Sequence, residues 1–559
     1  MDASRANADE TQLARARLSY ERRDWADARL AYSRVGNRAA MSAEDVDRES
    51  RCAWWLGDTP ASIATGEELV HRLEDAGRNR EAAMVSLRLG LQWALRGDLA
   101  IHAGWYAKAR RLLAALPVGP EHGYLRYVTA MLVTDDTGMP EDAEAAASVL
   151  RGMERTFGSR ALGAFALVLS AQAKILRGDG DAGFDLLDEA MLPVVTGEVD
   201  PFWGGDIYCT VIHLTGQIGD FGRMRAWTDA LDAWSSELSQ TFSYAGIVRV
   251  HRLELLVAEG RWDEAAAELG PASNSIADTD TWVAGHGFAE LGHVLRLRGR
   301  RDEAAEAYAR ARRAGVDPEP GPALLAAAEG RRSEAVDAVR AAIASRPPVQ
   351  RLALLLPAVE LALDAGQHDA ARGFAAALAA DADRLGAAGA QAWAWHARAL
   401  LELHAARPDA AADAARAAAD LYRSQHLQYG LARAHEVLGR AETALDRRQD
   451  AAADVAIALA IFRRLGATSD VARLQAAAGA RGVGPLTPRE AQVLALVLGG
   501  ASNRATADAL FLSEATVRRH LANIFTKVGV SSRTAAAAWA REQGIEPVRV
   551  DAPHGPSAR

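Results

Sequence analysis

Apolar residues recur at helical spacing along most of the chain, in stretches that are separated by short polar turns. The turns at Gly260 and Gly299 are each followed by an acidic pair and then by a run rich in alanine. Residues three and four positions apart lie on one face of a helix. The pattern therefore predicts that residues 10–478 are all-α, with helices joined by short turns.

The turns recur at a regular distance. Glycines at positions 178, 219, 260, 299, 330 and 366 are separated by 41, 41, 39, 31 and 36 residues. The same phase continues without glycine near Arg407 and Arg448. Glycine can take the left-handed conformation that ends a helix, and the Asp or Ser that follows is expected to cap the next helix.

One helix pair of this kind buries too little apolar surface to be stable alone, so the pairs are expected to stack into an α-solenoid. The pattern resembles tetratricopeptide repeats in a longer form of about 40 residues. An irregular alanine-rich helical bundle is the alternative. Residues 1–9 precede the first repeat-like pattern, and we expect them to be disordered.

The repeat pattern weakens around residues 192–206. The segment 196–205 contains several residues that interrupt helices, so we expect a loop there. Phe202 and Trp203 of that loop form a candidate effector site. The alternative, which we favour, is that both rings fill gaps between irregular repeats.

The pattern of turn and capping residues changes after residues 479–485, a linker rich in glycine. Thr487-Pro488-Arg489-Glu490 has the features of a helix start, with Thr as N-cap, Pro at the first position and Glu closing a capping box. Three further helices are expected before residue 544. Ser502 caps the first of these, Ser513 caps the second, which ends at Gly529, and Ser531 or Ser532 caps the third.

The helix that begins after Ser513 has two different faces. Val517, Leu521, Ile524 and Val528 form an apolar stripe, and the opposite face carries arginine. A short helix, a tight turn and a longer helix of this kind form a helix-turn-helix, in which the longer helix enters the major groove of DNA. Arg518 and Arg519 are the predicted base contacts, since a guanidinium group can donate two hydrogen bonds to guanine.

The side chains around this helix are suited to phosphate oxygens. The predicted phosphate contacts are Thr487, Arg489, Asn503, Arg504, Thr516, Asn523, Lys527, Arg533 and Thr534.

These motifs, together with Leu512-Ser513-Glu514-Ala515-Thr516-Val517-Arg518-Arg519-His520 and Lys527-Val528-Gly529-Val530-Ser531-Ser532-Arg533-Thr534, resemble the LuxR-type DNA-binding domain over residues 486–544. The resemblance implies a four-helix domain with Arg518, Arg519 and Ala522 facing the bases. It also implies a fourth helix that pairs two domains through Ala537, Ala538 and Trp539. Ala505 and Thr506 depart from the family pattern, and Thr506 places a hydroxyl where an apolar side chain normally packs.

Charge is unevenly distributed along the chain. The net charge is -9, yet residues 484–544 carry seven Arg or Lys against four Asp or Glu, a balance of +3. A basic module on an acidic body fits a nucleic-acid partner for the module. The two cysteines are too few for a disulfide framework, and no apolar run approaches the ~18 residues of a membrane span. We therefore expect a cytoplasmic protein without a membrane contact.

Patterns for catalysis are missing from the sequence. None of the three lysines follows a glycine, which excludes a Walker A loop, and there is no Gly-x-Ser-x-Gly elbow. His286, Glu290 and His293 share one helix face, but their spacing is not that of a metalloprotease. We expect them to make polar contacts between helices, and we expect no enzyme activity, no cofactor and no metal.

Together these patterns predict a bacterial transcription regulator that binds double-stranded promoter DNA as a homodimer. The repeats would receive an effector or a partner protein such as RNA polymerase. The competing hypothesis is an interaction scaffold whose helix-turn-helix no longer binds DNA. Residues 545–559 are expected to form a disordered tail.

Overall fold

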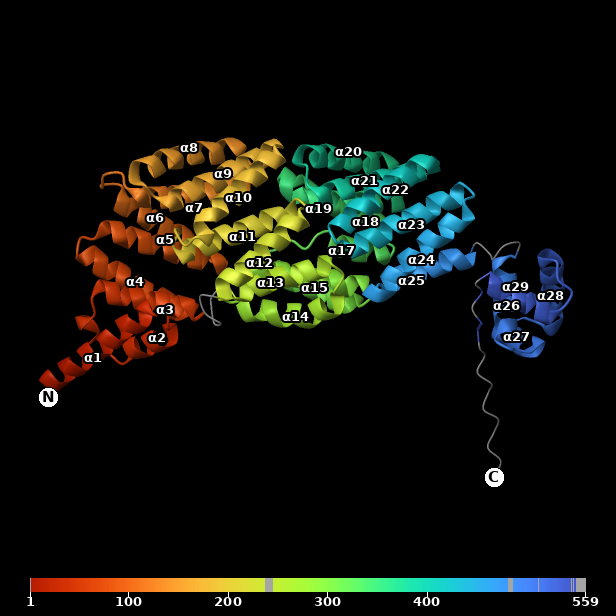
Figure 1. Cartoon of the computed structure of the whole chain (residues 1–559), viewed down its shortest axis with the longest axis horizontal. Coiled ribbons are helices and arrows are strands. Elements are labelled where there is room, and N and C mark those ends of the chain that lie inside the picture. Colours follow the sequence, from red (N-terminus) through yellow and green to blue (C-terminus); the bar gives the residue numbers. More distant parts are fainter. Residues whose placement is uncertain are drawn as a thin grey trace, which may run out of the picture. The chain divides into compact units, whose positions relative to one another are not determined.

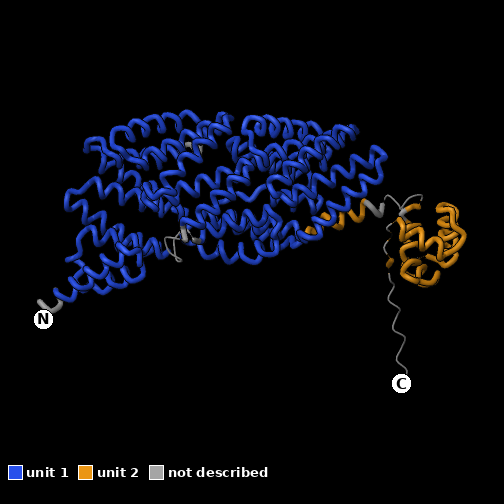
Figure 2. Tube along the Cα trace, in the orientation of Figure 1, with its two compact units in different colours: residues 1–466 blue, residues 467–559 orange. Residues whose placement is uncertain are grey.

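The computed structural model describes residues 2–236, 245–480, 486–510, 512–543, 545 and 547–548. All regular secondary structure in these ranges is helical. The chain divides into two compact units, residues 1–466 and 467–559 (Figure 2). The sequence pattern placed the end of the repeats at residue 478, whereas the division assigns α25 (Thr468–Ala480) to the second unit.

The described residues of the first unit form successive helices, with one short 3-10 turn at Arg38–Ala40 (Figure 1). The helices are α1 (Asp2–Glu21), α2 (Trp25–Ser33), α3 (Ala43–Trp55), α4 (Thr59–Asp75), α5 (Asn79–Leu95), α6 (Leu99–Leu113), α7 (Pro120–Thr137), α8 (Pro140–Phe157), α9 (Arg160–Arg177), α10 (Gly180–Val195), α11 (Pro201–Gln217), α12 (Phe221–Ser236), α13 (Ala245–Ala258), α14 (Trp262–Ile276), α15 (Thr281–Leu297), α16 (Arg301–Arg313), α17 (Gly321–Ala328), α18 (Arg332–Ala344), α19 (Pro348–Asp364), α20 (His368–Leu385), α21 (Ala388–His404), α22 (Pro408–Ser424), α23 (Gln428–Ala444) and α24 (Arg448–Leu465).

Each helix packs against the next one along the chain, and most odd-numbered helices also contact the next odd-numbered helix, as in α5 with α7, α13 with α15 and α21 with α23. The odd-numbered helices therefore form one layer of the array, and the even-numbered helices cover it. This arrangement confirms the predicted α-solenoid of stacked helix pairs.

The turns between pairs have the predicted left-handed residue. Gly178 has φ +86°, and its turn is closed by backbone hydrogen bonds that include Asp179 N to Lys174 O (2.9 Å). Where glycine is missing, Ala406 and Asp446 take the same conformation, with φ +55° and +57°. The repeat thus imposes this geometry on any residue at that position, at an energetic cost for those with a Cβ atom.

The predicted side-chain caps are present in only some of these turns. Asp220 accepts a hydrogen bond from Arg223 N (3.0 Å), whereas Asp179 precedes α10 without one and Arg261 occupies the corresponding position before α14. Backbone bonds already close the turns, so an acceptor side chain is not required at each of them.

The array turns back so that α9 and α11 contact α19, and α10 contacts α20 (Figure 1). The approach is close enough to involve backbone. Gly389 N donates to Gly219 O (3.0 Å), and a Cβ atom on Gly180 would lie 1.9 Å from Leu385 O. Gly222 N donates to Gln425 Oε1 (3.1 Å), 203 positions away.

Two expectations for the first unit are wrong. Residues 2–9 belong to α1, because a stretch of alanine and polar residues without Gly or Pro continues the helix toward the N-terminus. Residues 201–205 also belong to a helix, α11, where Asp200 accepts from Phe202 N (3.0 Å) and Pro201 occupies the first turn.

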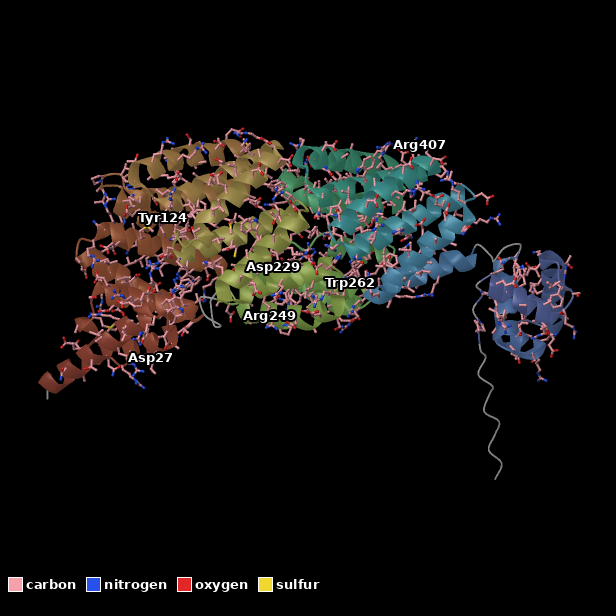
Figure 3. All side chains as sticks on the ribbon, viewed as in Figure 1. Asp27, Tyr124, Asp229, Arg249, Trp262 and Arg407 are labelled. Atoms are coloured by element: carbon pink, nitrogen blue, oxygen red, sulfur yellow. The ribbon has the colours of Figure 1, made fainter. Side chains whose placement is uncertain are left out.

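Phe202 and Trp203 are consequently buried, with 3% and 2% of their surface exposed. Phe202 packs on Trp54 with ring centroids 5.2 Å apart. Tyr124, labelled in Figure 3, lies 5.2 Å from the rings of both Phe165 and Trp203. The two rings fill the space between α3, α7, α9 and α11, so contact with an effector would require the repeats to separate.

The second unit contains α25 and the four predicted helices, α26 (Pro488–Leu498), α27 (Asn503–Leu510), α28 (Glu514–Val528) and α29 (Arg533–Glu542). Its core includes Val493, Leu494, Val517, Ile524 and Ala536. Ile545 is also buried in it, and Val548 N donates to Ala495 O (3.0 Å). The ordered part thus extends beyond residue 544, where we expected the tail to begin.

Residues 481–485 of the predicted linker and residues 549–559 of the predicted tail lie outside the described residues. Residues 479 and 480 end α25. Within the described ranges, no helix combines the length and apolar character that a membrane crossing needs.

Candidate nucleic-acid interface

Capping residues begin and end the helices α26 and α28 where the sequence predicted. Thr487 Oγ1 accepts from Glu490 N (3.3 Å) and Thr487 N donates to Glu490 Oε2 (2.8 Å), which completes the capping box. Ser513 caps α28 by accepting from Thr516 N (3.1 Å), and Gly529 ends it with φ +70°.

The two faces of α28 differ as predicted. Val517 is fully buried, and Leu521 and Ile524 are buried beside it. Arg518, Arg519 and Ala522 are exposed on the other side of the helix. Within the described part of this domain, the side chains of Arg518 and Arg519 have no hydrogen bond or ion pair, so both guanidinium groups are available to a ligand.

Lys527 is less available to a DNA phosphate than predicted, because it forms an ion pair with Glu490 (Nζ to Oε2, 2.7 Å). Glu490 is only 3% exposed. Burial by itself would raise the pKa of the Glu490 carboxyl, but the Lys527 ammonium and the Thr487 donors outweigh burial and hold this pKa below its ordinary value. The pair ties α26 to α28, and a phosphate contact by Lys527 would have to compete with it.

Arg489 and Arg533 hold the two ends of α27. Arg489 donates from Nη2 to Leu510 O (2.5 Å), where α27 ends. Arg533 donates to Ala501 O and to Asn503 Oδ1, the latter at 2.9 Å, where α27 begins. Both arginines therefore position the first helix of the helix-turn-helix, a role that the sequence did not reveal.

The remaining predicted phosphate contacts lie at the surface of the domain. Arg504, Asn523 and Thr534 are exposed, while the half-buried Thr516 shares a hydrogen bond with Ser513 (Oγ1 to Oγ, 2.8 Å). Arg504 has no hydrogen bond or ion pair among the described residues, so it is the free cation of α27.

Thr506 on α27 is fully buried, and its hydroxyl has no hydrogen-bond partner among the described residues. The departure noted in the sequence thus leaves an unsatisfied polar group in the core, which costs stability. On α29, Ala538 is exposed, and Ala537 and Trp539 are half-buried. The exposed side of α29 is where a second domain would have to pack.

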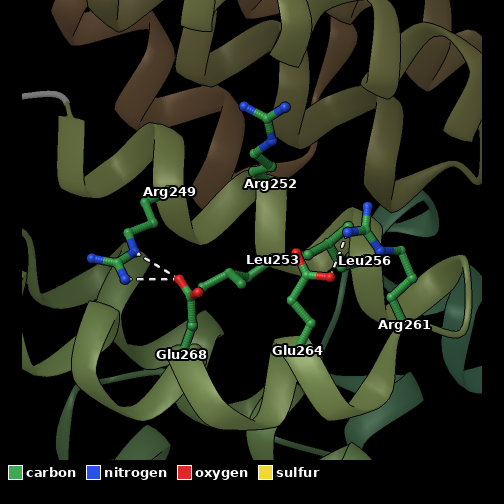
Figure 4. Close-up of a pocket in the computed structure, with 7 residues that line it drawn as sticks. All are labelled: Arg249, Arg252, Leu253, Leu256, Arg261, Glu264 and Glu268. Atoms are coloured by element: carbon green, nitrogen blue, oxygen red, sulfur yellow. Dashed lines mark hydrogen bonds and ion pairs between the residues drawn. The ribbon is translucent and has the colours of Figure 1, made fainter.

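The first unit has less to offer as a catalytic site. His286, Glu290 and His293 lie along one face of α15, but no group of three His, Cys, Asp or Glu residues in the described ranges is arranged to hold a metal. A depression of about 260 Å³ lies between α13 and α14 (Figure 4). Its guanidinium groups are neutralised, as in Arg249 with Glu268 (2.7 Å), Arg252 with Asp232 (2.6 Å) and Arg261 with Glu264.

The comparisons with known proteins concern mainly the C-terminal domain. Residues 484–540 match the family described as "Bacterial regulatory proteins, luxR family". A 57-residue segment is 47% identical to the CsgBAC operon transcriptional regulatory protein of Escherichia coli (strain K12), covering 10% of this chain and 26% of the relative. A 64-residue segment is 44% identical to the transcriptional regulatory protein DegU of Brevibacillus brevis, covering 11% and 27%. The chain thus spans about a quarter of the length of these relatives.

Solved structures are similar to the chain at a lower level. The APC/C hetero-tetramer Cut9–Hcn1 has a TM-score of 0.39 at 12% identity, covering 81% of this chain and 87% of the other. The Rap protein complexed with competence and sporulation factor has a TM-score of 0.37 at 11% identity, covering 69% and 99%. These TM-scores are low, so the solenoid is assigned from the stacked helix pairs of this chain and not from the solved structures. The C-terminal residues 484–540 form a LuxR-type helix-turn-helix domain, and an all-α helical-repeat solenoid precedes it.

Proposed function

We propose that the protein is a sequence-specific DNA-binding transcription regulator. The observation that carries this proposal is the exposure of the guanidinium groups of Arg518 and Arg519 on α28, which have no ion pair or hydrogen bond among the described residues. The opposite face of α28 is anchored in the core. A helix held in this way can enter the major groove, and arginine can donate two hydrogen bonds to guanine O6 and N7. The names of the relatives, which describe transcriptional regulators, support the same activity.

Phosphate contacts would supply the affinity that does not depend on sequence. We assign this role first to Arg504, together with Asn523 and Thr534. The other predicted phosphate contacts would contribute only after giving up or sharing their present side-chain bonds, and these are Thr487, Thr516, Lys527, Arg489, Asn503 and Arg533.

In this proposal the solenoid receives an effector or a partner protein, RNA polymerase among the candidates. Two copies pair through α29, and each places its α28 on one half of a two-fold operator. A half-site spacing of about one helical turn follows from the geometry of such domains. The protein acts in the cytoplasm, where promoter DNA is accessible, and it is not an enzyme.

The test is binding of the full-length chain to genomic promoter fragments over a salt series. We expect binding to differ among sequences and to weaken as salt rises. Arg518→Ala should cost about 1–3 kcal/mol and relax the base preference. Arg504→Ala should weaken all sequences about equally and reduce the salt dependence.

Equal behaviour of the two variants would refute the division between base and phosphate contacts. Absence of binding at low salt would support the interaction scaffold in place of the regulator.

A further inference from the structure

Two helices of the even-numbered layer carry charge of opposite sign. α6 contains three cations and no carboxylate, whereas α10 contains four carboxylates and no cation. α14 is also acidic without a cation, but each of its carboxylates is paired with an arginine. The charges of α6 and α10 are therefore not balanced within their own helices.

The exposed face of α6 changes from apolar to cationic along the helix. Leu99 at the N-terminal end is 64% exposed, and Ala103 and Ala107 follow on the same side at helical spacing. Arg110 and Arg111 are exposed at the C-terminal end, and their side chains have no hydrogen bond or ion pair among the described residues. We call these five residues the basic face.

The exposed face of α10 changes in the opposite sense. Asp181, Asp185 and Glu189 are exposed, and within the described ranges none of their carboxylates has a hydrogen bond or an ion pair. Leu192 and Val195 follow on the same side toward the C-terminal end, and they are 60% and 53% exposed. We call these five residues the acidic face.

The two faces are complementary when the helices run antiparallel. Arg110 follows Leu99 by 11 residues and Asp185 precedes Val195 by 10 residues, so charge and apolar surface are about 15–17 Å apart on both helices. Antiparallel packing places Leu99 against Val195 and, at the same time, brings the arginines to Asp185. Parallel packing would place Leu99 against the carboxylates.

The two faces cannot meet in this way within one chain. Each helix of the array packs on the next across a short turn, so neighbouring helices run in opposite directions and α6 and α10 run in the same direction. An antiparallel contact between them requires a second copy of the chain.

We propose that the basic face of one copy packs antiparallel on the acidic face of another copy. The contact joins two different surfaces, so each copy keeps one face of each kind free, and the assembly closes into a ring or continues. Two helices of 15 and 16 residues bury less surface than a stable dimer needs, so we expect weak association. This inference does not rest on the proposed function, and its surface is separate from α29.

The test is sedimentation velocity of the full-length chain without DNA, from low to high micromolar concentration. The average sedimentation coefficient should rise with protein concentration. The rise should be smaller at high salt, because salt screens exposed charges.

Charge reversal on either face should weaken the association. Arg110→Glu together with Arg111→Glu should raise the dissociation constant by about tenfold or more, since attraction becomes repulsion. Asp185→Arg together with Glu189→Arg should have the same effect. The matched control reverses two exposed arginines outside both faces, Arg155→Glu on α8 and Arg301→Glu on α16, and should leave the association unchanged.

Mixing the two reversed variants identifies the contact. The reversed α6 of one variant then meets the reversed α10 of the other, so an equimolar mixture should recover the association that each variant lacks alone. If a reversed variant is less stable in urea, Leu192→Ser takes its place and should weaken the association by about tenfold.

The proposal is overturned by any of three results. The first is a sedimentation coefficient that does not change with concentration. The second is association that neither a reversed variant nor Leu192→Ser weakens, as expected for pairing through α29 alone. The third is a mixture of the two reversed variants that associates no better than each variant alone.

Discussion

The C-terminal domain and the solenoid differ in the sequence distance of the contacts that define them. In the C-terminal domain the ion pair of exposed Lys527 with buried Glu490 joins residues 37 positions apart. In the solenoid Gly222 and Gln425 meet across 203 positions, and glycine backbone makes several of the contacts.

The comparison shows why one region discloses its site in the sequence and the other does not. A small helical domain keeps its capping residues, apolar stripe and exposed arginines within one short pattern. A solenoid that returns on itself brings together side chains from helices whose sequence patterns show no relation, as in the contact of His213 of α11 with Trp282 of α15.

The strongest test of this difference is Gly180→Ala. Helix propensity alone predicts a gain of about 0.5–1 kcal/mol, but the added Cβ would lie 1.9 Å from the Leu385 carbonyl oxygen. We expect a net loss of about 3 kcal/mol, measured by urea unfolding of the full-length chain. The control is Gly366→Ala, which meets no atom within 4 Å and should cost only the left-handed strain of about 1 kcal/mol. Equal losses would show that the contact between α10 and α20 is not tight.

The next largest effect is expected for Lys527→Ala. It leaves Glu490 buried without its cation, so the C-terminal domain should lose about 2 kcal/mol of stability. Because the pKa of Glu490 is lowered in the folded state, its contribution is present above the ordinary carboxyl value of about 4.3 and is lost as pH falls through the folded pKa. Unfolding followed by circular dichroism from pH 7 to pH 3 should show this acid-dependent loss in the natural chain.

The same pH series distinguishes the contribution of the Lys527–Glu490 pair from the effect of acid on the other carboxyl groups. In Lys527→Ala together with Glu490→Gln, the part of the acid loss that Glu490 causes should disappear. If the stability of the double variant depends on pH as in the natural chain, Glu490 does not cause the loss of stability in acid.

Thr506→Val should raise the stability of the C-terminal domain by about 1 kcal/mol. The two side chains have similar shape, and the substitution removes a buried hydroxyl that has no hydrogen-bond partner within the described ranges. Thermal unfolding measures the gain, and affinity for DNA serves as the control because Thr506 is not exposed. A loss of stability would mean that the hydroxyl is hydrogen-bonded, for example to an internal water.

The smallest effect is expected for Ala406→Gly in the turn before α22. Ala406 has φ +55°, so glycine should relieve left-handed strain and stabilise the solenoid by about 0.5–1 kcal/mol. Ala405→Gly beside it has φ -81° and should be neutral or destabilising. Comparing the urea midpoints of the two variants distinguishes relief of strain from a general effect of glycine.

The sequence by itself determined the helices, the left-handed turns and the exposed face of α28, because capping, φ preference and apolar periodicity act between residues a few positions apart. It favoured Phe202 and Trp203 as rings that fill gaps between repeats, but it did not disclose that they belong to helix α11 or that the rings they pack against come from α3, α7 and α9. Only the tertiary structure decided which cations are free. Lys527, Arg489 and Arg533 are bonded to other helices or to the turns between them, whereas the side chains of Arg504, Arg518 and Arg519 have no such bond in the part of the chain that the structure describes. The reason is that a partner's position in space depends on packing and not on spacing along the chain.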